Sequence, residues 1–331
     1  MKKIRAGVIG GAGYTGGELV RLLLNHDAVE IQFIQSRSQA GKPISSVHRD
    51  LLGVSDLVFT NDPTDWQKNP CDVVFLTLQH GETRPFLEKN SFDASVRLID
   101  ISSDLRLKAS STVSGREFIY GLPELQRDAI RESHSISNPG CFATAIQLSL
   151  LPLAKQKKLG RSTVFGITGA TGAGQKLTDT SHFAFRANNI QAYKTLDHQH
   201  VGEIEQSLAM LQGNGEAKVN FVPLRGDFTR GIFITSVIDV PGMSVNQLKS
   251  LYQDFYESHP FVSVVDHAID LKSVVNTNRA QIEIQHKDGT FAIHVVIDNL
   301  LKGASGQAVQ NMNLMFGLPE TQGLMLKGAA F

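Results

Sequence analysis

Short apolar runs alternate with amphipathic stretches in the first third of the chain. The apolar runs cover residues 4–9, 29–34, 72–78 and 97–101, and residues 17–25 between the first two repeat with helical spacing. Apolar runs separated by helical stretches are typical of buried parallel strands joined by crossover helices. The pattern therefore predicts an α/β domain with a doubly wound parallel sheet.

The pattern changes beyond residue 159. The expected strands become longer and several alternate with a period of two residues, which is typical of sheets with one buried face. We expect strands at 164–168, 217–222, 231–240, 281–285 and 291–297, and helical segments at 194–212, 245–256 and 306–316. This predicts a second, α+β domain with a mostly antiparallel sheet, and a domain boundary near residues 138–141.

Composition and charge exclude several classes of protein. Lys and Arg together number 32, as do Asp and Glu, so no basic surplus favours nucleic acid or an anionic membrane surface. The chain has no run of about 18 apolar residues, so no membrane span is predicted, and the apolar run at 4–9 is too short for a signal peptide. Two cysteines cannot form a disulfide framework, which favours a reducing compartment. We expect a cytoplasmic protein.

A glycine-rich segment separates the first expected strand from the first expected helix. Glycines in this position let the backbone turn sharply and approach a pyrophosphate, which the N–H groups and dipole of the helix start stabilise. The alternative is a tight turn without a ligand, but the strand–turn–helix context favours dinucleotide binding of the Rossmann type. The candidate cofactor-binding residues here are Gly10, Gly11, Gly13, Tyr14, Thr15 and Gly16.

The residues after the second expected strand indicate which cofactor binds. An NAD enzyme normally has an acidic residue there, whereas this chain has Ser36, Arg37 and Ser38. A guanidinium group flanked by hydroxyls suits the 2′-phosphate of NADP(H), although Arg37 would also be ordinary in a solvated loop. His80 follows another strand and is a further candidate for the cofactor site, with a plain loop histidine as the alternative.

Cys141 is the candidate nucleophile. It follows a Pro-Gly turn and precedes a stretch with helical periodicity, so it is expected at a helix N-terminus. The dipole and unpaired N–H groups there favour a thiolate. Cys71 enters an apolar strand and is expected to be an inert core residue.

The segment His198-Gln199-His200-Val201-Gly202-Glu203 carries the second candidate group. Two histidines and a carboxylate suggest either a metal site or a general acid/base, but no further Cys, His or Asp cluster completes a metal site. We therefore expect no metal, and we interpret the segment as an acid/base imidazole oriented by Glu203.

These motifs together resemble those of the N-acyl-gamma-glutamyl-phosphate reductases of arginine biosynthesis, relatives of aspartate-semialdehyde dehydrogenase. The likeness extends over nearly the whole chain. It runs through GGAGYTGGEL (10–19), FLTLQHG (75–81), IDISSDLRL (99–107), YGLPE (120–124), NPGCFAT (138–144), HQHVGEI (198–204), TRGI (229–232) and DNLLKGASGQAVQNMN (298–313).

The resemblance implies a reaction and a set of roles. It implies NADPH-dependent reduction of an acyl phosphate to a semialdehyde through a thioester on Cys141, with His200 as acid/base. It implies that Gln307 and Gly172 lie at the cofactor, and that Arg106, Asn138 and Arg230 bind the substrate's anionic groups. It also implies a cofactor domain of residues 1–141 and 301–331, a catalytic and oligomerisation domain of residues 142–300, and a homodimer or homotetramer.

Three local departures from the family leave the acyl group open. Phe142-Ala143 replaces Tyr-Pro, Thr168–Gln175 differs from the common S-G-V-S-G-A-G-R, and HQHVGE replaces H-R-H-x-P-E. Acetyl is the expected acyl group and succinyl the alternative. A sister dehydrogenase acting on aspartyl phosphate, and a catalytically silent NADP-binding protein, are the competing functions.

Overall fold

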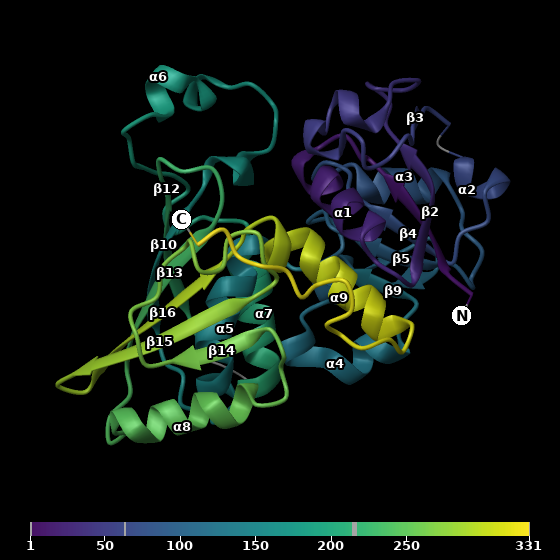
Figure 1. Ribbon diagram of the computed structural model, residues 1–331. Coiled ribbons are helices and arrows are strands. Elements are labelled where there is room, and N and C mark those ends of the chain that lie inside the picture. Colours follow the sequence, from purple (N-terminus) through teal and green to yellow (C-terminus); the bar gives the residue numbers. More distant parts are fainter. Residues whose placement is uncertain (1, 63, 214–216, 331) are drawn as a thin grey trace. The chain divides into compact units, whose positions relative to one another are not determined.

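The computed structural model describes residues 2–62, 64–213 and 217–330 (Figure 1). The chain forms two compact units: Met1–Pro139 with Ala304–Met325, and Gly140–Gly303 with Leu326–Phe331. The predicted cofactor domain begins at residue 1 and ends at residue 331, and both of these residues lie outside the described part of the chain. No helix in the described part of the chain is both long and apolar enough to cross a bilayer.

The first unit is built on a seven-stranded sheet in the order β3-β2-β1-β4-β5-β9-β8, and every pair of neighbours is parallel. The strands are β1 (Ile4–Ile9), β2 (Val29–Gln35), β3 (Phe59–Thr60), β4 (Val73–Leu76), β5 (Arg97–Asp100), β8 (Ile119–Tyr120) and β9 (Ser135–Ser137). The helices are α1 (Tyr14–Leu24), α2 (Asp65–Lys68), α3 (Thr83–Lys89), α4 (Pro123–Glu132) and α9 (Gly306–Met315), and β6 (Thr112–Val113) pairs with β7 (Arg116–Glu117) in a small hairpin. The predicted doubly wound parallel sheet is confirmed.

Strand order reverses beside β1, which has β2 on one side and β4 on the other. In open α/β sheets, ligands bind outside the carboxyl ends of the strands at such a switch point. The glycine segment follows β1 and the turn with His80 follows β4, so both meet there. One boundary differs from expectation, because α1 begins at Tyr14 rather than near residue 17.

The chain returns to the first unit through α9, all of whose residues are buried. The amide of Asn311 donates to the carbonyl of Gly121 at 2.9 Å and to Oδ1 of Asn138 at 3.0 Å. The last residues differ from expectation, because Leu326–Phe331 belong to the second unit. There the N–H of Ala329 donates to the carbonyl of Val275 at 3.2 Å.

Asp100, at the end of β5, makes the stability of the protein depend on pH. Its carboxylate is fully buried and accepts hydrogen bonds from Thr83 and from the hydroxyl and N–H of Ser102. Burial, the largest effect, raises its pKa from 3.8 to about 6 despite these bonds. A raised carboxyl pKa stabilises the fold at low pH, and this contribution is lost as pH rises through about 4 to 6.

We therefore expect Asp100→Asn to gain stability over wild type as pH rises from 4 to 7, by on the order of 2 to 3 kcal/mol. Urea unfolding at several pH values measures this difference. Asp128→Asn is the matched control, because the Asp128 side chain is 88% exposed. A constant difference between Asp100→Asn and wild type across this pH range would contradict the prediction.

The second unit is built on a mixed sheet in the order β11-β12-β10-β13-β16-β15-β14. Its strands are β10 (Ser162–Thr168), β11 (Gln191–Ala192), β12 (Val219–Arg225), β13 (Ile232–Asp239), β14 (Val262–Val265), β15 (Ala280–Lys287) and β16 (Thr290–Ile297). The pairs β10–β12 and β14–β15 are parallel and the other four are antiparallel. The predicted mostly antiparallel sheet is confirmed. Strands β11 and β14 were missing from the prediction, and β10, β12, β15 and β16 are longer than predicted.

Three helices pack on one face of this sheet: α5 (Cys141–Lys155), α7 (His200–Gln212) and α8 (Val245–Tyr256). Buried residues therefore alternate along β13 with residues of the opposite face, such as Phe233, Thr235 and Val237. Between β10 and β11 the chain forms an arm (residues 170–192) that carries the short helix α6 (Phe183–Arg186) beyond the strand ends (Figure 1).

Candidate functional site

The glycine segment is shaped to leave its backbone open at the start of α1. Gly10 has φ +86° and a side chain there would meet the Thr77 carbonyl at 2.7 Å, while one at Gly16 would meet the Gly11 carbonyl at 2.6 Å. A Cβ on Gly13, the residue before α1, would meet nothing within 4 Å. The turn is therefore closely packed against neighbouring backbone at Gly10 and Gly16 and open at Gly13, before the helix start. A pyrophosphate needs such an open side to approach the N–H groups of the helix.

Two neighbours anchor this turn. The N–H groups of Gly10 and Gly11 both donate to the carbonyl of Gln35 at 3.0 Å, which fixes the turn to the end of β2. The ring Nε2 of His48 lies 2.8 Å from the carbonyl of Gly11. His48 is a buried residue that sequence reasoning missed, and no local motif marks it, because it lies 37 residues away.

The residues predicted to select the cofactor directly follow β2. Ser36 is buried, whereas Arg37 and Ser38 are exposed. Arg37 donates to both carboxylate oxygens of Glu82, at 3.0 and 3.1 Å. Because the Arg37 side chain is 72% exposed, this ion pair contributes little stability, and another anion can replace it. His80 lies at the end of β4, where its Nδ1 accepts from the N–H of Ser103.

Cys141 is the first residue of α5, as the sequence predicts. Gly140 precedes the helix in an extended conformation, and the thiol is only partly buried. The first N–H groups of a helix have no partner within it and favour an anion. The Cβ of Cys141 lies against Gly303, where an added Cβ would come within 2.7 Å of it.

Glu203 connects the predicted acid/base segment to the residue before the predicted nucleophile. One carboxylate oxygen accepts from the N–H of Gly140 at 3.1 Å, and the other lies 3.9 Å from Nε2 of His200. Both side chains are almost fully buried. Glu203 thus holds the residue before Cys141 as well as facing the imidazole, a double role that the sequence did not indicate.

His198 supports His200. Its Nδ1 accepts from the N–H of His200 at 3.2 Å, and the two rings lie 4.6 Å apart. Burial, reinforced by Lys194, lowers the pKa of His198 to about 4, so this ring is neutral at physiological pH. Its edge also contacts Phe142, the residue after Cys141.

Tyr193 and Arg225 belong to the same group, and sequence reasoning missed both. Arg225 lies 4.8 Å from the Tyr193 ring, and that ring contacts His198 at 5.8 Å. Burial and the charge of the nearby Cys141 raise the pKa of Tyr193 to about 12, against the effect of Arg225, so the phenol keeps its proton. They lie in segments without a recognisable motif, and only the pairing of β11 with β12 brings them together.

The other predicted site residues are distributed over both units. In the first, Arg106 is buried and donates to the carbonyls of Asn138 and Ile101, and Gln307 is fully buried on α9. In the second, Arg230 is ion-paired with Asp298 at 2.9 Å, and Gly172 lies in the 3₁₀ turn Ala170–Ala173. Their roles in binding remain predictions.

Two further findings concern the cysteines and metals. Burial raises the pKa of Cys71 to about 12, and its thiol donates to the carbonyl of Asn69, so it is an inert core residue. Within residues 2–62, 64–213 and 217–330, no group of three or more His, Cys, Asp or Glu side chains is arranged to hold a metal ion.

Comparison with known structures shows the fold. Aspartate semialdehyde dehydrogenase II from Vibrio cholerae, complexed with ASA, superposes with a TM-score of 0.76 at 16% identity, over 96% of this chain and 99% of that one. Aspartate semialdehyde dehydrogenase with NADP from Candida albicans gives 0.71 at 16% identity, over 95% and 99%.

Comparison with known sequences shows the family. The model of the semialdehyde dehydrogenase NAD binding domain matches residues 5–133, and that of the semialdehyde dehydrogenase dimerisation domain matches residues 141–299. Proteins of Phocaeicola vulgatus and Bacteroides thetaiotaomicron, both named N-acetyl-gamma-glutamyl-phosphate reductase, are 51% identical over 99% of this chain and 100% of their own lengths. A Flavobacterium johnsoniae protein of the same name is 48% identical over the same shares. The chain thus belongs to the N-acetyl-gamma-glutamyl-phosphate reductase family, an oxidoreductase family of semialdehyde dehydrogenases.

Proposed function

We propose that the protein reduces an N-acyl-L-glutamyl 5-phosphate to the N-acyl-L-glutamate 5-semialdehyde with NADPH, in arginine biosynthesis. The observation that carries the proposal is the group Cys141, His200 and Glu203, in which a partly exposed thiol begins a helix beside a buried imidazole and carboxylate. The names of the relatives support the substrate class.

Cys141 acts as the nucleophile in this proposal. Its thiolate attacks the acyl carbon, a C–S bond forms, and the C–O bond to phosphate breaks as phosphate leaves with the electron pair. The N–H groups at the start of α5 are donors for the oxyanion that forms in between. The carboxylate of Glu203 holds Gly140, and thereby the turn that presents these donors.

Bound NADPH supplies the hydride that reduces the thioester. His200 donates its proton to the oxygen that becomes negative when hydride adds to the thioester. It takes the proton back as the aldehyde forms and the Cys141 thiolate leaves. Glu203, 3.9 Å from the imidazole, stabilises the protonated ring. His198 cannot take this role at neutral pH, because burial keeps its ring unprotonated.

The first unit fits an NADP(H) cofactor. A dinucleotide's pyrophosphate fits the open side of Gly13 at the start of α1, and Ser36, Arg37 and Ser38 suit a 2′-phosphate beyond β2. No acidic residue ends β2, where an NAD enzyme would use one for the ribose hydroxyl. We include Tyr14, Thr15, His80, Gly172 and Gln307 in the proposed cofactor site.

Turnover in the reverse direction tests the function. N-acetyl-L-glutamate 5-semialdehyde, NADP⁺ and inorganic phosphate should give NADPH, and omission of phosphate should abolish it. Aspartate semialdehyde in place of the glutamate derivative tests the sister activity. Phosphate-independent turnover, or preference for aspartate semialdehyde, would overturn the assignment, and a lack of all turnover would favour a silent NADP-binding protein.

Arg37 is expected to determine the choice between NADPH and NADH. Because a guanidinium binds phosphate through charge-assisted hydrogen bonds, Arg37→Ala should raise the KM for NADPH about 10- to 100-fold and leave that for NADH nearly unchanged. Glu82→Gln removes the competing carboxylate and should lower the KM for NADPH. Arg131→Ala is the control, an exposed arginine that also pairs with a carboxylate. Equal changes for both cofactors would exclude Arg37 from the 2′-phosphate site.

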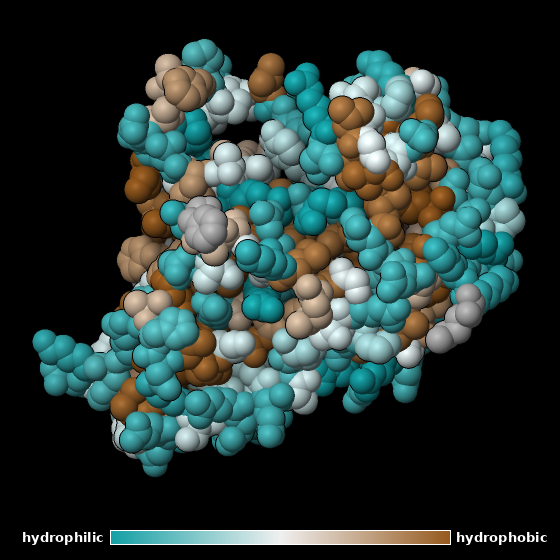
Figure 2. Space-filling model, in the orientation of Figure 1, coloured by the Kyte–Doolittle hydropathy of each residue, from teal (hydrophilic) through white to brown (hydrophobic). Residues whose placement is uncertain are grey.

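We also propose that the protein is a homodimer that pairs through the exposed part of the second sheet's face opposite the helices. On that face Phe165 is 46% and Val237 is 37% exposed, and Figure 2 shows hydrophobic surface where β10, β12 and β13 lie. Sedimentation should give the mass of two chains for the wild type and the mass of one chain for the double variant Phe165→Lys, Val237→Lys. Met210→Lys, on the exposed side of α7, should leave the dimer intact. A wild-type monomer would contradict this.

Two free cysteines, one of them the proposed nucleophile, support a reducing compartment, and we propose the cytoplasm. Fractionation of cells that express the protein tests the location.

The substrate-binding residues of the proposal are Arg106, Asn138 and Arg230, and the acyl group is acetyl or succinyl.

A further inference from the structure

Arg186 is the one buried residue of the arm, all of whose residues the structure describes. It is 9% exposed, and its three guanidinium nitrogens have no hydrogen-bond partner among the described residues. Its guanidinium carbon lies 5.9 Å from the centre of the Phe185 ring. A buried charge that lacks a partner destabilises the fold. A residue that carries such a charge is therefore more often retained because it binds a ligand than because it stabilises the protein.

The arm leaves the second sheet at the end where the proposed nucleophile lies. Arg225 at the end of β12, Thr168 at the end of β10 and Ile232 at the start of β13 are in register there. Ile232 in turn pairs with Ile297, the residue before Asp298, and the segment after it brings Gly303 against Cys141. Arg186 and Cys141 therefore belong to the same end of one sheet.

Local contacts tie Arg186 to this site. Two residues further along, the N–H of Asn188 donates to the carboxylate of Asp227 at 2.6 Å, and Gln191 then pairs with Arg225. From Arg225, ring contacts lead through Tyr193 and His198 to the residue beside Cys141. Arg186 is thus connected to the site through several intervening residues.

This separation indicates which anion Arg186 meets. In an acyl phosphate the phosphate is bonded to the carbon that Cys141 attacks, so it lies at the sulfur. The opposite end of the substrate bears the α-carboxylate and the acyl group. Because a guanidinium binds a carboxylate bidentately, we infer that Arg186 binds a carboxylate of the N-acyl amino acid, at the end remote from the reacting carbon. This inference rests on the proposed function.

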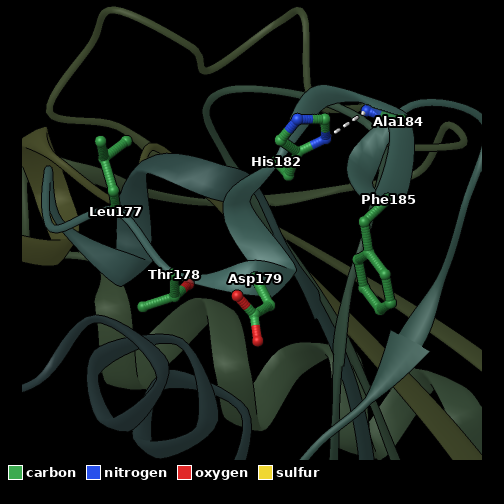
Figure 3. A pocket seen from close by; sticks show the side chains of 6 residues that line it. All are labelled: Leu177, Thr178, Asp179, His182, Ala184 and Phe185. Atoms are coloured by element: carbon green, nitrogen blue, oxygen red, sulfur yellow. Dashed lines mark hydrogen bonds between the residues drawn. The ribbon is translucent and has the colours of Figure 1, made fainter.

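The nearby arginines differ from Arg186 in that each has a partner. Arg230, itself proposed to bind the substrate, pairs with Asp298, and Arg225 lies over the ring of Tyr193. The arm also has an open pocket of about 620 Å³ (Figure 3). Its six lining residues are Leu177, Thr178, Asp179, His182, Ala184 and Phe185, which include an acid and no Lys or Arg, so it does not suit an anionic substrate.

Steady-state kinetics of Arg186→Gln, in the reverse direction with both N-acetyl- and N-succinyl-glutamate semialdehyde, test the inference. We expect KM for at least one semialdehyde to rise about 10- to 100-fold, kcat to change less, and KM for inorganic phosphate to stay constant. Arg186→Lys should recover part of the loss, because it restores the charge without the planar fork. Arg161→Gln removes the same charge from an exposed residue at the opposite end of β10 and should have no effect.

The outcomes separate the two sources of the carboxylate. A loss confined to the succinyl compound places Arg186 at a carboxylate on the acyl group, and an equal loss for both places it at the α-carboxylate. A change in KM for phosphate alone, or none at all, overturns the inference. If wild type shows no turnover, the proposed function fails. Calorimetric titration with N-acetyl- and N-succinyl-glutamate then tests Arg186 directly, and equal binding to wild type and Arg186→Gln, or none to either, overturns the inference.

Discussion

Replacing Cys141 with serine should lower phosphate-dependent turnover at least about 10³-fold, a loss of about 4 kcal/mol in transition-state stabilisation. A serine hydroxyl at this position is a far weaker nucleophile than a thiolate, and an oxygen ester accepts hydride less readily than a thioester. The fold should persist, because the side chain is only partly buried and the change is small. Reverse-direction kinetics and a thermal melt measure the two effects.

The second cysteine provides the control for this experiment. Cys71→Ala should cost stability, because the thiol is buried in the first unit's core, but turnover should remain close to wild type. Iodoacetamide should modify one thiol of the native wild-type protein and none of Cys141→Ser, because burial raises the pKa of Cys71 to about 12. Near-normal turnover of Cys141→Ser would rule out the thioester route.

Much of the fold follows from hydrophobic patterning, because long buried strands and amphipathic helices have clear periods. Strand β1 and helix α8 have the predicted bounds. Short elements such as β3 and β11, with two residues each, carry too few positions to show a period. Their place is set by their neighbours in the sheet, which local sequence does not reveal.

The proposed site shows the same division between local and distant information. The position of Cys141 was predictable, because a Pro-Gly turn and a helical stretch adjoin it in sequence. The hydrogen bond from the N–H of Gly140 to Glu203 joins residues 63 positions apart in the sequence. Tyr193 lies beside Arg225 because β11 pairs with β12. Arg186 lies in a mostly exposed segment, where burial of a single charge leaves no periodic signal.

Gly303→Ala should lower kcat about 10²-fold, although residue 303 carries no reactive group. A Cβ there would lie 2.7 Å from the Cβ of Cys141, 3.2 Å from its Cα and 3.3 Å from the carbonyl of Asp298. Real side chains do not approach so closely, so either the start of α5 or the segment after Asp298 must move. Displacement of a reacting group by about 1 Å commonly costs a factor of this size.

The matched control is Gly160→Ala, because a Cβ on Gly160 would meet nothing within 4 Å and its backbone does not require glycine. Overpacking at residue 303 should also cost about 1 to 3 kcal/mol of stability, so turnover is compared at a temperature where melts show both variants folded. In the background of Cys141→Ser the Gly303→Ala substitution should lower turnover little further, because it acts through the position of that sulfur. Wild-type kcat in Gly303→Ala would show that the nucleophile tolerates displacement, and additive losses in the double variant would show that Gly303 acts elsewhere.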